Sequence, residues 1–120
     1  MEKNIEICLL LDFYGQLLTP RQEEIMNMYY NNDLSLGEIA ENLGITRQGV
    51  HDNIRRSENT LIEMEERLSL VKKFKDNKAK VKTVLERISF LGDELSEKRY
   101  ESANNEINKI KNILNSIIDD

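Results

Sequence analysis

Six polar residues at the beginning of one helical segment have the chemistry needed to read a DNA groove. Arg47 can form paired hydrogen bonds with guanine, and Gln48 can do so with adenine. Arg55 and Arg56 follow about two turns later, where guanidinium groups can reach phosphates. The same face could instead be solvated or contact another protein. The candidate nucleic-acid-binding residues are Thr46, Arg47, Gln48, His51, Arg55 and Arg56.

Patterns typical of catalytic and metal sites are missing from the sequence. His51 is the only histidine, and Cys8, the only cysteine, lies in an apolar stretch. A metal site needs several such ligands close together. The sequence also lacks a glycine-rich phosphate loop and an evident pair of catalytic acids. We therefore expect a protein that is not an enzyme and that uses no metal or cofactor.

The polar residues belong to a segment, about residues 35–57, with the spacing of a helix-turn-helix. Ala40 is small enough for two helices to cross steeply, and Gly44 can adopt the left-handed conformation of a sharp turn. Ile45, directly after the turn, is expected to anchor the corner in the core. The expected motif core is Ile39, Ala40, Gly44, Ile45, Val50 and Ile54.

Apolar residues recur at helical spacing along the rest of the chain, while glycine and proline are scarce, at five and one. Capping boxes beginning at Thr19 and Ser35 mark two helix starts. Helices are expected at about residues 4–17, 20–30, 36–43, 47–75, 81–91 and 96–118. The first should be well buried, with Leu17 widening its apolar face. The predicted fold is all-α, a helix-turn-helix with a long recognition helix and a C-terminal helical hairpin.

Two apolar seams follow a nearly heptad spacing, one from Val50 to Val71 and one from Tyr100 to Ile117. They could close a bundle within one chain or build a dimer. The dimer is favoured because one chain of 120 residues has little core to cover both seams. The expected organisation is a helix-turn-helix domain at residues 1–71, a basic hinge at 72–80, and amphipathic helices at 81–120 that form a homodimer.

The charge balance argues against tight, autonomous binding to nucleic acid. The formal net charge is −5, whereas dedicated nucleic-acid binders are usually basic. Residues 19–68 contain five arginines, no lysine and ten acidic residues. A membrane span needs roughly 20 apolar residues, and the chain has no such run and no signal-peptide pattern at its start. A single cysteine also forms no internal disulfide, so we expect a cytoplasmic protein with no membrane contact.

The chain resembles two known protein families. Leu18-Thr19-Pro20-Arg21-Gln22, followed by residues 36–54, resembles the promoter-reading fourth region of bacterial sigma factors. Over its whole length the chain resembles the YlxM family of small bacterial helix-turn-helix proteins, through residues 11–19 and 33–40. The YlxM resemblance implies a cytoplasmic protein linked by genetic context to the signal recognition particle pathway, as a regulator. Together with the helix-turn-helix and its exposed polar residues, it leads us to expect a DNA-binding regulatory protein. The alternative is an adaptor that binds the particle's protein or RNA and keeps the motif as a scaffold.

Overall fold

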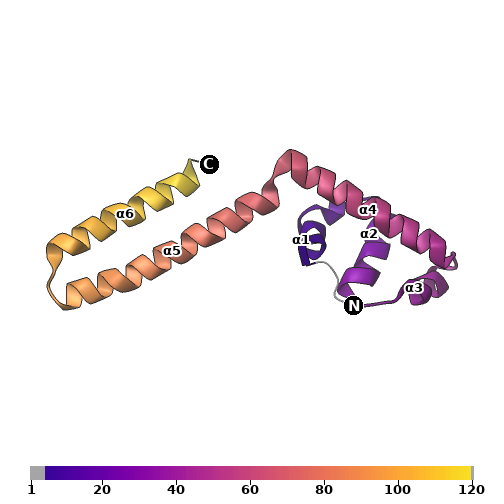
Figure 1. Ribbon diagram of the computed structural model, residues 1–120, viewed down its shortest axis with the longest axis horizontal. Coiled ribbons are helices and arrows are strands. Elements are labelled where there is room, and N and C mark those ends of the chain that lie inside the picture. Colours follow the sequence, from indigo (N-terminus) through magenta and orange to yellow (C-terminus); the bar gives the residue numbers. More distant parts are fainter. Residues whose placement is uncertain (1–4, 120) are drawn as a thin grey trace. The chain divides into compact units, whose positions relative to one another are not determined.

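The computed structural model describes residues 5–119, and they form an all-α fold, as predicted. Six α-helices, one 3-10 turn and one π-helical turn account for nearly all of this range, and none of these residues forms a strand. The chain divides into two compact units, an N-terminal unit (Met1–Val71) and a C-terminal unit (Lys72–Asp120). Figure 1 shows the order of the helices along the chain.

The N-terminal unit begins with two short helices. Helix α1 (Ile5–Tyr14) is followed by the 3-10 turn Gly15–Leu17, and helix α2 (Pro20–Met26) continues into the π-helical turn Asn27–Asn31. Thr19 caps α2 through the predicted capping box. Leu17, which was expected to be buried, is instead 63% exposed. The tighter 3-10 turn changes the direction of the side chains after Tyr14, so Leu17 leaves the buried face of α1.

The helix-turn-helix is formed by α3 (Leu36–Leu43) and α4 (Arg47–Leu68). Ser35 caps α3 through the second predicted capping box, and Gly44 ends that helix at φ +66°. Helix α4 packs against α1, α2 and α3. Its apolar seam is therefore covered inside the N-terminal unit, and the reason for expecting this particular seam to need a second chain is wrong.

The core of the N-terminal unit is one continuous apolar cluster drawn from all four helices. Its most enclosed members, each with no exposed surface, include Ile25, Met26, Ile39, Val50 and Leu61. Burial of such side chains stabilises a fold by about 1.5–3 kcal/mol each. The cluster fixes the orientation of α4, because four consecutive seam positions of that helix are buried in it: Val50, Ile54, Ser57 and Leu61.

Helix α4 stops at Ser69, whose backbone is left-handed at φ +55°. A tertiary network holds this break. The Tyr14 hydroxyl donates to Oε1 of Glu65 over 2.6 Å and accepts from the Leu70 amide over 3.1 Å. The same Glu65 oxygen accepts from the Val71 amide over 3.0 Å. The first amides of the next helix have no helical partner. They are satisfied here by two side chains: Tyr14, which is far from Ser69 in sequence, and Glu65, which lies on the preceding turn.

The C-terminal unit contains most of α5 (Leu70–Ser96) and all of α6 (Tyr100–Ile118). The two helices lie side by side and run in opposite directions (Figure 1). Residues 72–80, the expected hinge, are helical throughout, and α5 continues past Gly92. The basic stretch contains no residue that would end a helix without tertiary contacts. Helix α5 therefore continues as far as the turn at Lys98, where φ is +60°.

Candidate nucleic-acid interface

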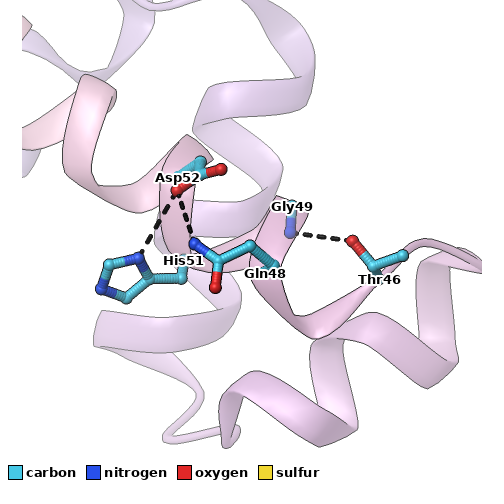
Figure 2. Close-up of polar contacts among 5 residues, drawn as sticks. All are labelled: Thr46, Gln48, Gly49, His51 and Asp52. Atoms are coloured by element: carbon cyan, nitrogen blue, oxygen red, sulfur yellow. Dashed lines mark hydrogen bonds and ion pairs between the residues drawn. The ribbon is translucent and has the colours of Figure 1, made fainter.

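The corner between α3 and α4 is built from local hydrogen bonds. The Ile45 amide donates to the Ala40 carbonyl over 3.1 Å, which closes the end of α3. At the next residue, the Thr46 hydroxyl accepts from the Gly49 amide over 2.9 Å and caps α4 (Figure 2). These bonds fix the first turn of α4 before any partner binds.

Five of the six expected motif-core residues occupy the positions predicted for them. Ile39, Ala40, Val50 and Ile54 are buried, and Gly44 forms the left-handed turn. Ile45 is the exception, because its side chain is 38% exposed rather than anchored in the core. It lies between two exposed residues of the corner, Gly44 and Thr46.

All six predicted nucleic-acid-binding residues have exposed side chains, but they do not form one surface. Arg47, Gln48, His51 and Arg55 line hollows beside α4; we call these four residues the α4 ridge. Arg56 lies about 100° further around the helix than its neighbour Arg55, and neither Arg56 nor Thr46 lines those hollows.

The α4 ridge borders two adjoining hollows, which share Leu36 and His51. The hollow near the helix start has a volume of about 270 Å³ and is lined by Leu36 and three ridge residues. The next has a volume of about 350 Å³. Together they form a groove beside the first three turns of α4. The larger hollow is lined by Tyr29, Leu36, His51, Ile54, Arg55 and Glu58.

Three groove residues were not identified from the sequence as part of a site. Tyr29 and Leu36 were interpreted as core residues, and each is only partly buried. Glu58 accepts a hydrogen bond of 2.6 Å from the Tyr30 hydroxyl. Burial and this carboxylate raise the pKa of Tyr30 well above its ordinary value. The helical period alone could have placed Glu58 one turn beyond Arg55, but the tyrosine that orients it is 28 residues away.

Asp52 engages two members of the α4 ridge. The Gln48 amide group donates to Oδ1 of Asp52 over 2.9 Å, and Nδ1 of His51 lies 3.6 Å from the same oxygen (Figure 2). Arg47 and Arg55 differ, because no ion pair joins either one to another residue within the described range 5–119. The ridge therefore presents two arginines directly, and a glutamine and a histidine that already share a carboxylate.

The local charge of the ridge contrasts with its surroundings. The N-terminal unit, residues 1–71, has six basic and thirteen acidic side chains, a formal balance of −7. Residues 46–56 contain three arginines and one aspartate. A positive strip on an acidic unit attracts an anion at short range, while salt screens the more distant repulsion over about 8–10 Å.

Comparison with known proteins gives the same assignment as the fold. The family model described as "Putative helix-turn-helix protein, YlxM / p13 like" matches residues 1–113. The protein belongs to this family, UPF0122. A UPF0122 protein of Desulforamulus reducens is 44% identical over 121 residues, which cover 99% of this chain and 96% of the relative. The resemblance to the YlxM family is therefore confirmed.

Two further UPF0122 relatives match more closely over shorter segments. The protein of Acetivibrio thermocellus is 58% identical over 88 residues, 73% of this chain and 75% of its own. That of Caldanaerobacter subterraneus is 54% identical over 78 residues, 65% of this chain and 67% of its own. The UPF0122 description names a helix-turn-helix protein and no catalytic activity.

The described residues form neither a metal-ion site nor a membrane-spanning helix. Within residues 5–119 no group of three or more His, Cys, Asp or Glu side chains is placed to hold a metal ion. In that same part of the chain, no helix has both the length and the apolar character to cross a bilayer. The groove beside α4 brings together four of the six predicted residues and is the candidate functional surface.

Proposed function

We propose that this UPF0122 protein is a regulatory protein that binds duplex DNA through the α4 ridge. The observation that carries the proposal is the rigid helix-turn-helix corner with Arg47 and Arg55 exposed along one groove. In this motif the beginning of the second helix enters the major groove and contacts base edges. Arg47 would contact a base or a phosphate near the helix start, and Arg55 would contact the backbone.

The ridge residues would take different roles. Gln48 can pair with adenine only after its amide leaves Asp52. Asp52 repels phosphate but can accept a hydrogen bond from cytosine. The affinity should therefore be modest and strongly dependent on salt, because most of the attraction comes from a few arginines on an acidic unit.

The test is fluorescence anisotropy with a pool of genomic duplex fragments at several salt concentrations. Arg47→Ala with Arg55→Ala should weaken binding at low salt and reduce the log-log salt slope by about 0.9 for each lost phosphate contact. The helical circular dichroism should stay unchanged, because both side chains are exposed. No measurable duplex binding by the unmodified protein at low salt would contradict the proposal.

A matched control removes two arginines elsewhere in the same unit. Arg21 and Arg67 are exposed and lie outside the groove residues. Arg21→Ala with Arg67→Ala changes the net charge by the same amount as the ridge variant. Equal losses of binding in both variants would show that overall charge, rather than the α4 ridge, attracts the DNA.

The acidic balance of the N-terminal unit favours a second candidate function. In this alternative the ridge is a docking surface for a protein or RNA of the signal recognition particle. A pull-down with purified particle components should then retain the chain, and the ridge variant should lose retention while duplex binding is absent in both. Absence of retention under these conditions would exclude the adaptor function.

A further inference from the structure

The hairpin of the C-terminal unit packs together through a seam whose α5 side is largely polar. Buried or half-buried side chains of α5 recur every three or four residues on its side toward α6: Asn77, Lys80, Val84, Arg87, Leu91 and Glu94. Nη1 of Arg87 lies 2.9 Å from Oε1 of Glu106 on α6. Nη2 of Arg99, in the turn between the helices, lies 3.2 Å from Oε1 of Glu94. Only two of the six α5 positions are apolar.

The apolar side chains of α5 form a second, exposed stripe. Val81, Leu85, Ile88 and Leu95 are 47%, 60%, 49% and 48% exposed, and Phe74, also at this spacing, is 48% exposed. Helix α6 has a similar stripe, with Tyr100, Leu114 and Ile118 exposed by 60%, 42% and 77%. Ile107, which is half-buried, also belongs to the α6 stripe. We call the two stripes together the apolar face of the hairpin.

The two stripes lie on the same side of the hairpin. At about 100° per residue, each stripe is roughly a quarter turn from the polar seam, in the same rotational sense along its own helix. Because α5 and α6 run in opposite directions, equal rotations bring both stripes to one face. A soluble chain rarely leaves so many large apolar side chains together in water.

We propose that this apolar face binds the same face of a second copy of the chain, with α5 antiparallel to α5 of the partner. The proposal gives a geometry to the homodimer expected from the sequence. It does not depend on DNA binding, because it concerns the C-terminal unit alone. Its product is a four-helix bundle of two hairpins, related by a two-fold axis across the helices.

The spacing of the α5 stripe is self-complementary in this orientation. The sequence numbers of Phe74 and Leu95 have the same midpoint, 84.5, as those of Val81 and Ile88, and this point lies between Val84 and Leu85. Antiparallel pairing about this midpoint therefore places Val81 opposite the partner's Ile88, and Phe74 opposite the partner's Leu95. A two-fold interface requires this reciprocal matching.

The α6 stripe gives an independent check of the same axis. The Arg87–Glu106 and Glu94–Arg99 pairs align the two helices so that the position of Leu85 on α5 lies across from about residue 108 on α6. The α6 stripe from Tyr100 to Ile118 is centred at the neighbouring position, 109. One two-fold axis therefore passes through the middle of both stripes.

The charge distribution along α5 favours the antiparallel direction. Residues 72–82 contain six lysines and one aspartate, whereas residues 87–97 contain one arginine and three acidic residues. Antiparallel pairing about the same midpoint places the basic half of one α5 over the acidic half of the other, twice. Such complementary charges fix the register and orientation of paired helices.

The first test is sedimentation equilibrium of the full chain over a range of concentrations. The expected species has twice the chain mass of 14.0 kDa. Leu85→Asp puts two carboxylates at the centre of the interface and should raise the dissociation constant by about 100-fold or more. Ile62→Asp is the matched control, because Ile62 is 42% exposed on α4, and it should leave the dimer intact. A chain that stays monomeric at every concentration up to about 100 µM would overturn the proposal, because specific dimers usually bind more tightly than that.

The second test measures orientation through engineered disulfides in a Cys8→Ser background. Val81→Cys and Ile88→Cys chains should each remain uncrosslinked when oxidised alone and should crosslink to each other when mixed. Identical positions would be about 10 Å apart along the helix axis, too far for a disulfide. Crosslinks between two Val81→Cys chains, or none in the mixture while the dimer persists, would exclude the antiparallel α5 pair. Duplex binding is measured separately, so a monomer that binds DNA would refute only this inference.

Discussion

The two units of the chain distribute apolar and charged residues in opposite ways. The N-terminal unit buries most of its apolar side chains around α4 and leaves its arginines exposed. In the C-terminal unit, Glu94 and Glu106 are 2% and 5% exposed, while Leu85 and Ile118 are 60% and 77% exposed. A fold that is complete alone has the first distribution, because burial of apolar surface is the main stabilising contribution. The second distribution is typical of half an assembly.

Incomplete hydrogen bonding sharpens this contrast. Asn77 Oδ1, Arg87 Nε and Glu94 Oε2 are buried and have no hydrogen-bond partner within residues 5–119. Each unsatisfied buried polar atom costs about 1–3 kcal/mol. All three belong to α5, on the seam of the hairpin. The hairpin alone is therefore expected to be far less stable than the N-terminal unit.

The largest expected effect is on the core of the N-terminal unit. Ile54→Ala should lower the free energy of unfolding by about 2–5 kcal/mol, because Ile54 is buried and its removal leaves a cavity. Ile62→Ala on the same helix should cost far less, since Ile62 is 42% exposed. Urea unfolding followed by circular dichroism measures both. A cost near zero for Ile54→Ala would show that the core has been assigned wrongly.

Removal of the Tyr14 hydroxyl should have the next largest effect. Tyr14→Phe leaves Glu65 without its donor and the Leu70 amide without its acceptor, at a cost of about 1–3 kcal/mol. Tyr30→Phe removes a hydrogen bond of the same 2.6 Å length from a half-buried tyrosine, and it should cost less. Equal costs in urea unfolding would mean that the network at Ser69 contributes no more than a surface hydrogen bond.

The same tyrosine predicts a pH dependence. Burial and the Glu65 carboxylate raise the pKa of Tyr14 above its ordinary value of 10.0. The unfolded chain therefore loses this proton first, so the contribution of neutral Tyr14 is complete below about pH 10 and is lost as the pH rises above that value. Between pH 9 and pH 11, Tyr14→Phe should show a smaller loss of unfolding free energy than the unmodified chain. An identical decline would contradict the raised pKa.

A comparison of one substitution with two tests the polar seam of the C-terminal unit. Glu106→Gln should destabilise the hairpin by about 1–2 kcal/mol, because Arg87 loses its counter-charge although it is 35% exposed. Arg87→Leu with Glu106→Leu should be near neutral or stabilising, since an apolar pair replaces a desolvated ion pair. Hydrogen exchange of the α5 and α6 amides reports on this unit specifically. A large loss in the double variant would mean that the ion pair itself holds the hairpin.

The smallest effects concern the two left-handed backbone positions at which α3 and α4 end. Gly44→Ala should cost about 1 kcal/mol through backbone strain alone, because a Cβ there would meet no atom within 4 Å. Ser69→Gly should relieve similar strain and stabilise the chain by up to about 1 kcal/mol. Thermal unfolding measures both shifts. Destabilisation by Ser69→Gly would mean that the serine side chain contributes more than the backbone strain costs.

Features set by neighbours in the sequence could be predicted, and features set by distant contacts could not. The capping boxes at Thr19 and Ser35 and the turn at Gly44 depend on residues within four positions, and all three are confirmed. The exposure of Arg47 and Arg55 follows from the helical period once Val50 is placed inside. The break at Ser69 depends on Tyr14, more than 50 residues away. The sequence pattern therefore did not indicate this break and predicted that the helix would end near residue 76 instead.

The candidate site shows the same division. The positions of the six polar residues on the surface of α4 followed from periodicity, but their grouping did not. Leu36 and Tyr29 enter the groove because α3 and the π-helical turn pack beside α4. The burial of Ile45 was predicted from its residue type and its position after Gly44. Neither feature indicates how far the core extends under the corner.

The Tyr14 contact has a consequence for the order in which the chain is made. Tyr14 is synthesised 56 residues before the Leu70 amide with which it bonds. Until residues 65–71 have been added, the growing polypeptide lacks the hydrogen bonds that end α4 at Ser69. A shortened product that starts after α1 would lack the Tyr14 hydroxyl permanently. Without that hydroxyl, α4 and α5 would no longer be held apart at Ser69 and could form one continuous helix.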